Sequence, residues 1–135
     1  MREQELVDRL TSSLKTKLGP AYRVTQNYAS ASIEGLSPDA RPDIVIMQDG
    51  SQRTLIVEVK TPSEGQELPL ATARTTLALK QANAAFNPLV ALVTSPRTVS
   101  PLLKEELDAQ RVAVLSDGDF ETVVSRLVKL ASEAR

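Results

Sequence analysis

The sequence predicts an α/β domain in which a mixed central sheet is flanked by helices. Helix-like and strand-like patterns follow one another in the order α-β-β-β-α-β-α-β-α, and this alternation is typical of a sheet covered by helices. The later strands are short, continuous apolar runs, as expected of strands buried on both faces. The 135 residues contain no internal repeat and no long linker, so we expect a single domain over residues 1–135.

The first half of the chain has the pattern of one helix followed by three strands. Leucines recur every fourth residue from Leu6 to Leu18, and Gly19-Pro20 ends the helical pattern. Asp49-Gly50 lies between two β-rich runs and is a typical hairpin junction. In chain order, we expect a helix over 1–18, strands over 22–28, 44–47 and 54–59, and a serine-rich loop over 29–41.

The second half alternates helices with strands. Asn87-Pro88 ends one helical pattern, and Ser100-Pro101 begins another, with proline at a first-turn position where its missing N–H is tolerated. In chain order, we expect a helix over 70–86, a strand over 89–93, a helix from 100 to about 109, a strand over 112–115 and a helix over 120–134.

The composition excludes several kinds of active site. The chain has no cysteine and no histidine, so it contains no disulfide, thiol nucleophile, Cys/His zinc site or Ser-His-Asp triad. A net charge of −1 disfavours a strongly basic nucleic-acid coat but allows a local basic groove. No apolar run approaches the ~20 residues of a membrane span, and a secretory pattern is absent from the N-terminus. We expect a cytoplasmic protein without membrane contact, whose chemistry would use Asp, Glu, Lys and Ser.

Three charged residues are predicted to meet at one end of the sheet. Glu58 and Lys60 alternate with valines near the end of an otherwise apolar strand, so their side chains point to the same face. Asp43 begins the preceding strand, and a hairpin brings the start of one strand beside the end of the next. Asp43, Glu58 and Lys60 can therefore converge.

This set of residues favours metal-assisted hydrolysis of a phosphodiester. Two adjacent carboxylates repel each other unless a divalent cation neutralises them, and Mg²⁺ is held by one or two carboxylates, waters and phosphate oxygens. A bound metal lowers the pKa of a water molecule and stabilises the charge that develops on phosphorus. Lys60 could orient or deprotonate that water.

Pro42-Asp43 followed, after fourteen intervening residues, by Glu58-Val59-Lys60 resembles the signature of the PD-(D/E)XK nuclease superfamily. The likeness is to its small Holliday-junction-resolvase-like and restriction-endonuclease-like members. It implies a restriction-endonuclease-like core, α-β-β-β-α-β, here with a C-terminal α-β-α extension. It also implies that Asp43, Glu58 and the backbone carbonyl of Val59 ligate Mg²⁺, with Mn²⁺ as a substitute, and that Lys60 is the catalytic lysine.

Two further site residues follow from the same resemblance. Resolvase-like members place a glutamate on the first helix, and Glu3 is the better match because, at about 100° per residue, it falls on the leucine stripe while Glu5 points away. Many members also carry a polar residue on the helix after the motif, which would be Gln81 as an accessory residue. The RecB-type spacing of Gln and Tyr is not met, because position 85 is Ala.

The function expected from these residues is a metal-dependent DNA endonuclease, structure-specific like the junction resolvases or related to repair or defence. Branched or duplex DNA would be the substrate, and cutting a junction symmetrically requires a homodimer. Phosphate contacts are expected from the loop serine Ser32 and from three basic residues, Arg41, Arg74 and Lys80. The alternative is a catalytically inactive nuclease-fold module that binds nucleic acid or a partner within a larger complex.

Simpler structural interpretations stay open for each residue. Asp43 could cap a turn after Pro42, and Asp39 repeats the Pro-Asp dipeptide but lacks a following apolar strand. Glu58 and Lys60 could form a solvated pair on an edge strand. Glu3 could merely complement the helix dipole, and Gln81 could be a polar group on the helix surface.

Overall fold

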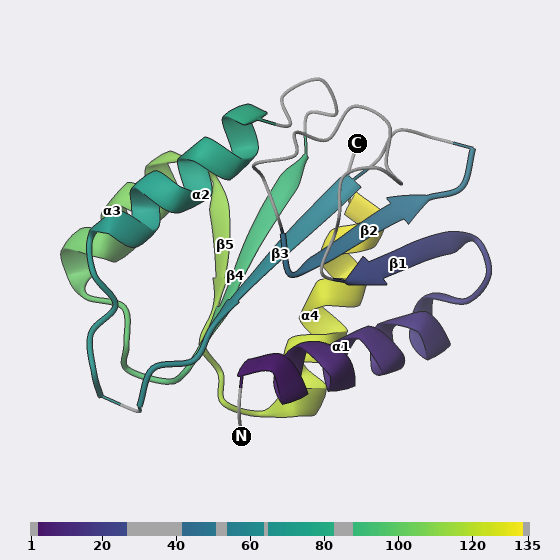
Figure 1. Cartoon of the computed structure of the whole chain (residues 1–135), viewed down its shortest axis with the longest axis horizontal. Coiled ribbons are helices and arrows are strands. Elements are labelled where there is room, and N and C mark those ends of the chain that lie inside the picture. Colours follow the sequence, from purple (N-terminus) through teal and green to yellow (C-terminus); the bar gives the residue numbers. More distant parts are fainter. Residues whose placement is uncertain (1–2, 27–41, 51–53, 64, 83–87, 134–135) are drawn as a thin grey trace.

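The computed structural model describes residues 3–26, 42–50, 54–63, 65–82 and 88–133, which form one sheet with helices on both of its faces (Figure 1). The predicted order of elements is confirmed. The ends predicted at 27–28 and 83–86, and the loop at 29–41, lie outside the described residues. The elements are α1 (Glu3–Leu18), β1 (Tyr22–Gln26), β2 (Ile44–Gln48), β3 (Thr54–Lys60), α2 (Ala71–Ala82), β4 (Leu89–Thr94), α3 (Pro101–Ala109), β5 (Val112–Leu115) and α4 (Phe120–Glu133).

The sheet has five strands in the order β1-β2-β3-β4-β5. The pairs β1/β2 and β2/β3 are antiparallel, whereas β3/β4 and β4/β5 are parallel. The predicted mixed sheet is therefore confirmed, and β3 is its central strand. In the hairpin, Ile44 lies opposite Val57, so the residue before β2, Asp43, comes beside Glu58.

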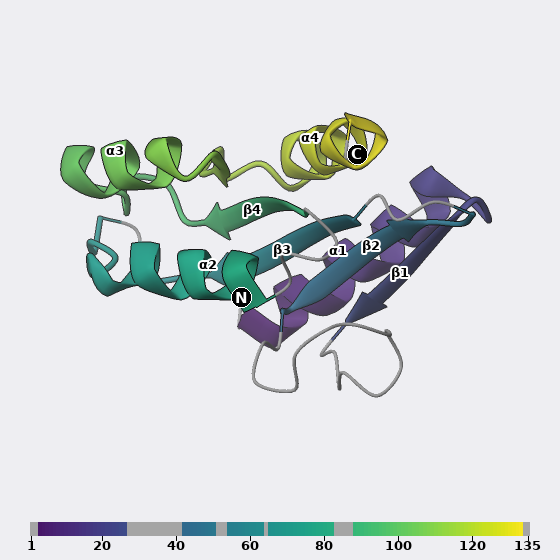
Figure 2. The same cartoon turned by 90° about the horizontal axis from the view of Figure 1, so that it is seen from above.

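Two apolar cores lie on opposite faces of the sheet. One joins α1 and α4 to strand residues such as Val57 and Val59. The other joins α2 and α3 to strand residues such as Ile56 and Leu92. α2 packs against α3 and α1 packs against α4, and both Figures 1 and 2 show α2 and α3 together at the left of the molecule. Because faces alternate along a strand, Glu58 lies on the α2/α3 face.

Local capping signals define the ends of the later helices. Ser100 accepts a hydrogen bond from the backbone N–H of Leu103 at 3.2 Å, and Pro101 follows it at the first helical position. Asp119 plays the same part for α4, because its Oδ2 accepts from the N–H of Thr122 at 3.1 Å. Such caps satisfy N–H groups that would otherwise lack partners. Among the described helices, none combines the length and apolarity needed to cross a bilayer.

Candidate active site

Asp43 and Glu58 are linked by two hydrogen bonds between side chain and backbone. The N–H of Asp43 donates to Glu58 Oε1 at 3.1 Å, and the N–H of Val59 donates to Asp43 Oδ2 at 2.7 Å. Each carboxylate therefore has one oxygen anchored by the backbone of the hairpin. Within the described residues, Asp43 Oδ1 and Glu58 Oε2 accept no hydrogen bond. The hairpin thus holds two carboxyl groups together, each with one oxygen left for a ligand.

Burial and mutual repulsion disfavour the ionised form of this pair. Glu58 is only 8% exposed, and burial, followed by the negative charge of Asp43, raises its pKa to about 7. The hydrogen bond from the Asp43 N–H and the charge of Lys60 oppose this shift. The pKa of Asp43 is raised too, chiefly by burial, against the hydrogen bond from Val59. A nearby cation would relieve both effects.

Lys60 is the last residue of β3 and shares the face of Glu58, as the strand alternation predicts. Both residues line a cavity of about 280 Å³ between the sheet and the first half of α2. The positive charge of Lys60 lowers the pKa of Asp43 and of Glu58. Lys60 and Glu58 therefore share one cavity, and the positive charge of Lys60 favours the ionised form of both carboxyl groups.

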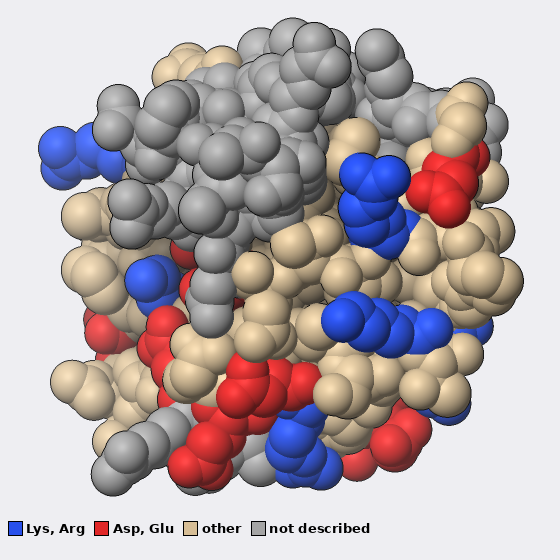
Figure 3. Space-filling model, turned by 45° about the vertical axis from the view of Figure 1, so that its right-hand side comes forward, with Lys and Arg blue, Asp and Glu red and all other residues tan. Residues whose placement is uncertain are grey.

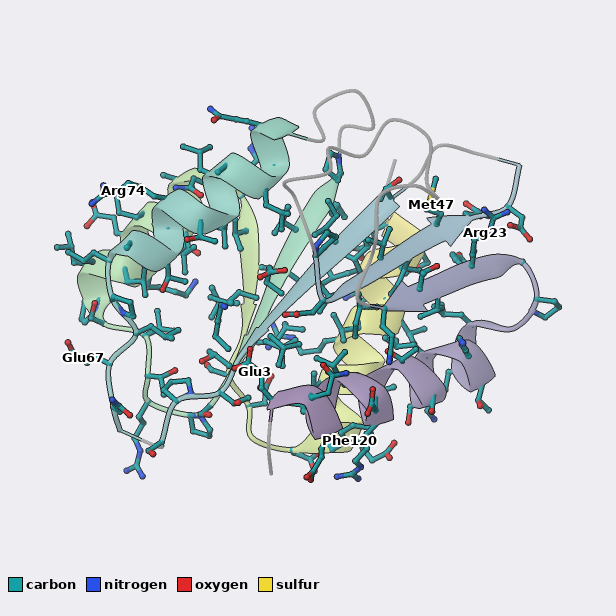
Figure 4. The ribbon with its side chains drawn as sticks, viewed as in Figure 1. Glu3, Arg23, Met47, Glu67, Arg74 and Phe120 are labelled. Atoms are coloured by element: carbon teal, nitrogen blue, oxygen red, sulfur yellow. The ribbon has the colours of Figure 1, made fainter. Side chains whose placement is uncertain are left out.

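Glu3 reaches the same end of the sheet from α1. Figure 4 shows Glu3 at the start of that helix, beside the end of the central strands. Its side chain is exposed, and its charge contributes to the raised pKa of both Asp43 and Glu58. Glu5 is not among the charges that act on the pair. Of the two glutamates, Glu3 is therefore the one whose charge acts on the carboxylate pair.

The structure does not bring the other predicted residues of α2 to this site. Gln81 is exposed on the last turn of α2, whereas residues from the first half of that helix line the cavity beside Glu58. The Lys80 ammonium donates to the carbonyl of Gln110, after α3, at 2.8 Å. Arg74 points outward from α2, away from the end of the sheet where Glu3 lies (Figure 4). An accessory role for Gln81 and phosphate contacts from Lys80 and Arg74 gain no support from this placement.

Three residues that the sequence analysis considered for the site lie outside the part of the chain that the structure describes. They belong to the segment before Pro42, which lies outside the described residues: Ser32, Asp39 and Arg41. The choice of Asp43 over Asp39 therefore rests on what Asp43 itself does. Asp43 is held against β3 by the bond from Val59, which is more than the turn cap that Pro-Asp alone would suggest.

Sequence reasoning missed a group of threonines on α2. Thr72, Thr75 and Thr76 line the cavity that Glu58 and Lys60 share. Thr76 donates to the carbonyl of Ala73 at 2.9 Å and contacts Gln110 Oε1 at 3.2 Å. The Thr72 side chain is 8% exposed, yet no described residue accepts or donates a hydrogen bond to its hydroxyl. The sequence did contain a signal for this group, because the three threonines stand at i, i+3 and i+4, the spacing that puts side chains on one helix face.

Charges of both signs are distributed over the molecule's surface near α1. On the face drawn in Figure 3, Lys and Arg side chains form separate groups, with Asp and Glu between them. The described residues on that face therefore make no continuous basic patch.

The donors at the carboxylate pair suit Mg²⁺ better than a transition metal. They are two carboxylates, to which the resemblance adds the carbonyl oxygen of Val59, and all of these are hard oxygen ligands. Among the described residues, no three acidic side chains lie close enough together to enclose a metal ion. Mg²⁺ commonly keeps several waters and binds through one or two carboxylates plus substrate oxygens, so a two-carboxylate site fits this ion.

Comparisons with known proteins establish the fold alone. No protein-family model matches the chain, and no curated protein sequence matches it. Among solved structures, the chain is similar to AF1548, a protein of unknown function, with a TM-score of 0.58 and 17% sequence identity. The likeness covers 81% of this chain and 56% of that one, so the present chain matches little more than half of its neighbour. The mixed α/β architecture therefore recurs in a protein seen by crystallography.

Proposed function

We propose that this chain is a metal-dependent endonuclease of the PD-(D/E)XK type that hydrolyses phosphodiester bonds in DNA. A structure-specific activity on branched DNA, similar to that of junction resolvases, is the form we favour. The observation that carries the proposal is the pair of Asp43 and the buried Glu58, joined through the hairpin backbone at 3.1 and 2.7 Å, with Lys60 on the same face as Glu58. A purely structural sheet end has no need of two adjacent carboxylates.

The residues present fit an Mg²⁺ ion held by Asp43, Glu58 and the carbonyl of Val59. When bound there, the ion would polarise a phosphate oxygen, acidify a water molecule and offset the developing negative charge. The two anchored carboxylates provide a rigid frame, because each is fixed by a backbone N–H of the hairpin. Glu58 is buried and Asp43 is half-buried, which strengthens electrostatic interactions at this position.

Lys60 would act on the attacking water and on the phosphate. Its ammonium group can donate hydrogen bonds to both, which orients the water toward phosphorus and favours the charge of the transition state. Glu3 adds a further negative charge that reaches the pair, and it would bind a water or a second cation.

A second function is favoured by one observation. The face shown in Figure 3 lacks a continuous basic patch among the described residues, whereas tight binding to DNA depends on Lys and Arg contacts to phosphates. This charge distribution suits a nuclease-fold module that has lost catalysis and binds within a larger complex. Such a module would keep the fold but would not need a metal.

Cleavage assays separate these two functions. Purified protein would be incubated with a four-way junction, a flap, a duplex and single-stranded DNA, each in Mg²⁺, Mn²⁺ or EDTA. We expect cleavage that requires the metal and is lost in Asp43→Asn and in Lys60→Met. The matched controls are Asp49→Asn, an exposed acid at the other end of β2, and Lys129→Met, an exposed lysine on α4. Both controls should cut like the unmodified protein.

The outcomes distinguish the alternatives clearly. Cleavage that persists in Asp43→Asn and Lys60→Met preparations would reject the site. DNA binding in EDTA without cleavage of any substrate in Mg²⁺ or Mn²⁺ would favour the inactive module. Sedimentation analysis in the same buffers would test the homodimer that symmetric cutting of a junction requires.

A further inference from the structure

A second cavity, larger than the one beside Glu58, opens at the same end of the sheet. Its volume is about 530 Å³, within the range of small-molecule sites. It is formed by the segments that follow β3 and β4, the start of α4 and one side of α1. Parallel strands β3, β4 and β5 end here, the edge of an α/β sheet at which ligands commonly bind. It lies on the α1/α4 face, whereas Glu58 and Lys60 face α2.

One wall of this cavity lies where the backbone of Gly118 closely approaches the ring of Pro96. Gly118 has a φ of +76°, and a Cβ placed on it would lie 2.8 Å from the Pro96 ring. Any other residue would be strained there and would push apart the turn after β4 and the segment before α4. Glycine at this position thus keeps the cavity wall closed between Pro96 and α4.

The cavity presents a flat stacked surface. The guanidinium group of Arg9, on α1, lies over the ring of Phe120 with its carbon 4.4 Å from the ring centroid. This distance is that of a cation–π contact, which holds a planar group in one orientation. Both residues line the cavity, together with the apolar side chains of Leu6, Val93 and Val123. The site offers planar and apolar contacts to a flat ligand.

The polar groups of the cavity carry both signs of charge. Asp119 lies on the lining with Arg9. Its Oδ2 accepts from the backbone and the hydroxyl of Thr122, while Oδ1 accepts no hydrogen bond from the described residues. These bonds from Thr122 lower the pKa of Asp119, so the group is an anion at neutral pH. A phosphate would meet this carboxylate, whereas a neutral ring with donors and acceptors on its edge would match both residues.

We propose that this cavity binds an unpaired nucleobase, with its ring against the Arg9–Phe120 stack and its donor edge toward Asp119. The inference rests on the proposed function, because it assigns the base to the nucleic acid whose backbone lies at the carboxylate pair. The two sites share β3: Thr61, on the cavity lining, directly follows Lys60, and consecutive Cα atoms are about 3.8 Å apart. Unpaired bases occur at junctions and flaps, so the cavity would contribute to choosing branched or single-stranded substrates.

Binding measured in EDTA tests this proposal without any need for catalysis. Saturation-transfer NMR on the full chain would use the four deoxynucleosides and inorganic phosphate as separate probes. Anisotropy would use a labelled single strand and a duplex of the same sequence. We expect signals from deoxynucleosides but not from phosphate, and tighter binding of the single strand. Arg9→Ala should weaken binding about tenfold, the scale of one stacking contact.

The variants are chosen so that folding and binding can be separated. Phe120 packs partly against the core, so Phe120→Leu keeps an apolar side chain while removing the aromatic face. Asp119→Asn removes the charge but keeps a good helix cap. Arg23→Ala, an exposed arginine on β1 away from Glu3 and Phe120 (Figure 4), is the matched control. Circular dichroism would verify the fold of each variant.

Each result decides the inference. Equal affinities for the Arg9→Ala and Arg23→Ala variants, or signals from phosphate that match those from deoxynucleosides, would overturn it. Nucleoside binding that is lost in Arg9→Ala would support it even if no DNA is cut, in which case only the proposed nuclease activity fails. Metal-dependent cleavage without any nucleoside or single-strand preference would overturn the base site and leave the nuclease standing.

Discussion

The carboxylates of Asp43 and Glu58 each accept a hydrogen bond from the backbone at or beside the other residue. The N–H of Asp43 donates to the Glu58 carboxylate, and the N–H of the residue after Glu58 donates to the Asp43 carboxylate. The register of β2 on β3 fixes this reciprocal arrangement. Two like charges are thus held at a distance that the sheet itself determines, and the free energy of their repulsion becomes a measurable property of the fold.

Stability should decrease as pH rises through the titration of Glu58. Its folded-state pKa is about 7, against an ordinary value of 4.5, so between these pH values the folded chain holds a proton that the unfolded chain releases. Raising the pH therefore favours unfolding, and the full effect is roughly 3 kcal/mol. Glu58→Gln, which cannot ionise but keeps an amide oxygen for the Asp43 N–H, should lose this pH dependence. Urea unfolding followed by circular dichroism at pH 4.5 to 8 measures it.

The difference between the original chain and Glu58→Gln isolates Glu58, because the remaining carboxylates titrate in both. Asp43, whose pKa is also raised, adds an effect of the same sign in each protein. Parallel stability curves for the two proteins across this pH range would contradict the buried, repelled carboxyl group.

Glu3→Gln should ease the ionisation of the pair, and Glu5→Gln should not. Both glutamates lie in the first turn of α1 and are exposed, so both substitutions remove a similar interaction with the helix dipole. Only Glu3 contributes to the raised pKa of Asp43 and Glu58. The free energy of unfolding that is lost between pH 5 and pH 8 should therefore be smaller in Glu3→Gln than in the original chain, and unchanged in Glu5→Gln. Identical profiles for the two variants would show that Glu3 does no more than complement the dipole.

Mg²⁺ should stabilise the chain at pH 8 and much less at pH 5.5, because protons compete with the ion for Glu58. Binding to the folded state alone raises the free energy of unfolding by about 2.7 kcal/mol at a hundredfold excess over the dissociation constant. Asp43→Asn and Glu58→Gln should lose this increment, and Asp49→Asn should keep it. Thermal unfolding with MgCl₂, compared with NaCl at equal ionic strength, provides the measurement. If MgCl₂ stabilised Asp43→Asn as much as the original chain, the ion would bind at a different site.

The fold was predictable because its signals are local. The leucine stripe of α1, the Asp49-Gly50 junction and the Ser100-Pro101 start of α3 each depend on neighbouring residues, and the structure has the helices and strands they indicate. The order of the strands in the sheet could not be predicted in this way, because the pairing of β4 with β3 and of β5 with β4 joins residues far apart in sequence. Local patterns carry no information about which of these parallel strands lie side by side.

In the candidate site, too, contacts within one hairpin could be predicted from the sequence, whereas contacts between distant segments could not. Asp43 and Glu58 could be brought together on paper because one hairpin connects them, and the register confirms that they are neighbours. Lys80 was expected at the surface as a phosphate contact, but α2 packs on α3 and its ammonium binds the Gln110 carbonyl. Thr72 was overlooked because its proximity to Glu58 depends on how α2 crosses the sheet, which no local pattern specifies.

Thr72 should be more important to catalysis than to stability. Thr72 is buried and lines the cavity shared with Glu58 and Lys60. Its hydroxyl makes no hydrogen bond to a described residue, so a water or a phosphate oxygen is the partner we expect during the reaction. Thr72→Val should leave the free energy of unfolding unchanged, or raise it by about 1 kcal/mol, because an unsatisfied polar group is removed. Cleavage should fall about tenfold, the effect of one lost hydrogen bond, and Thr72→Ser should restore it.

Thr76→Val is the matched control on the same helix face. Thr76 donates to the carbonyl of Ala73 and contacts the amide oxygen of Gln110, so this substitution should destabilise the chain by about 1–2 kcal/mol. Urea unfolding compares the two variants, and single-turnover cleavage of the substrate that the original chain cuts gives the rates. A loss of stability in Thr72→Val as large as that in Thr76→Val would mean that the Thr72 hydroxyl is a structural group, and the predicted role in positioning the substrate would then be wrong.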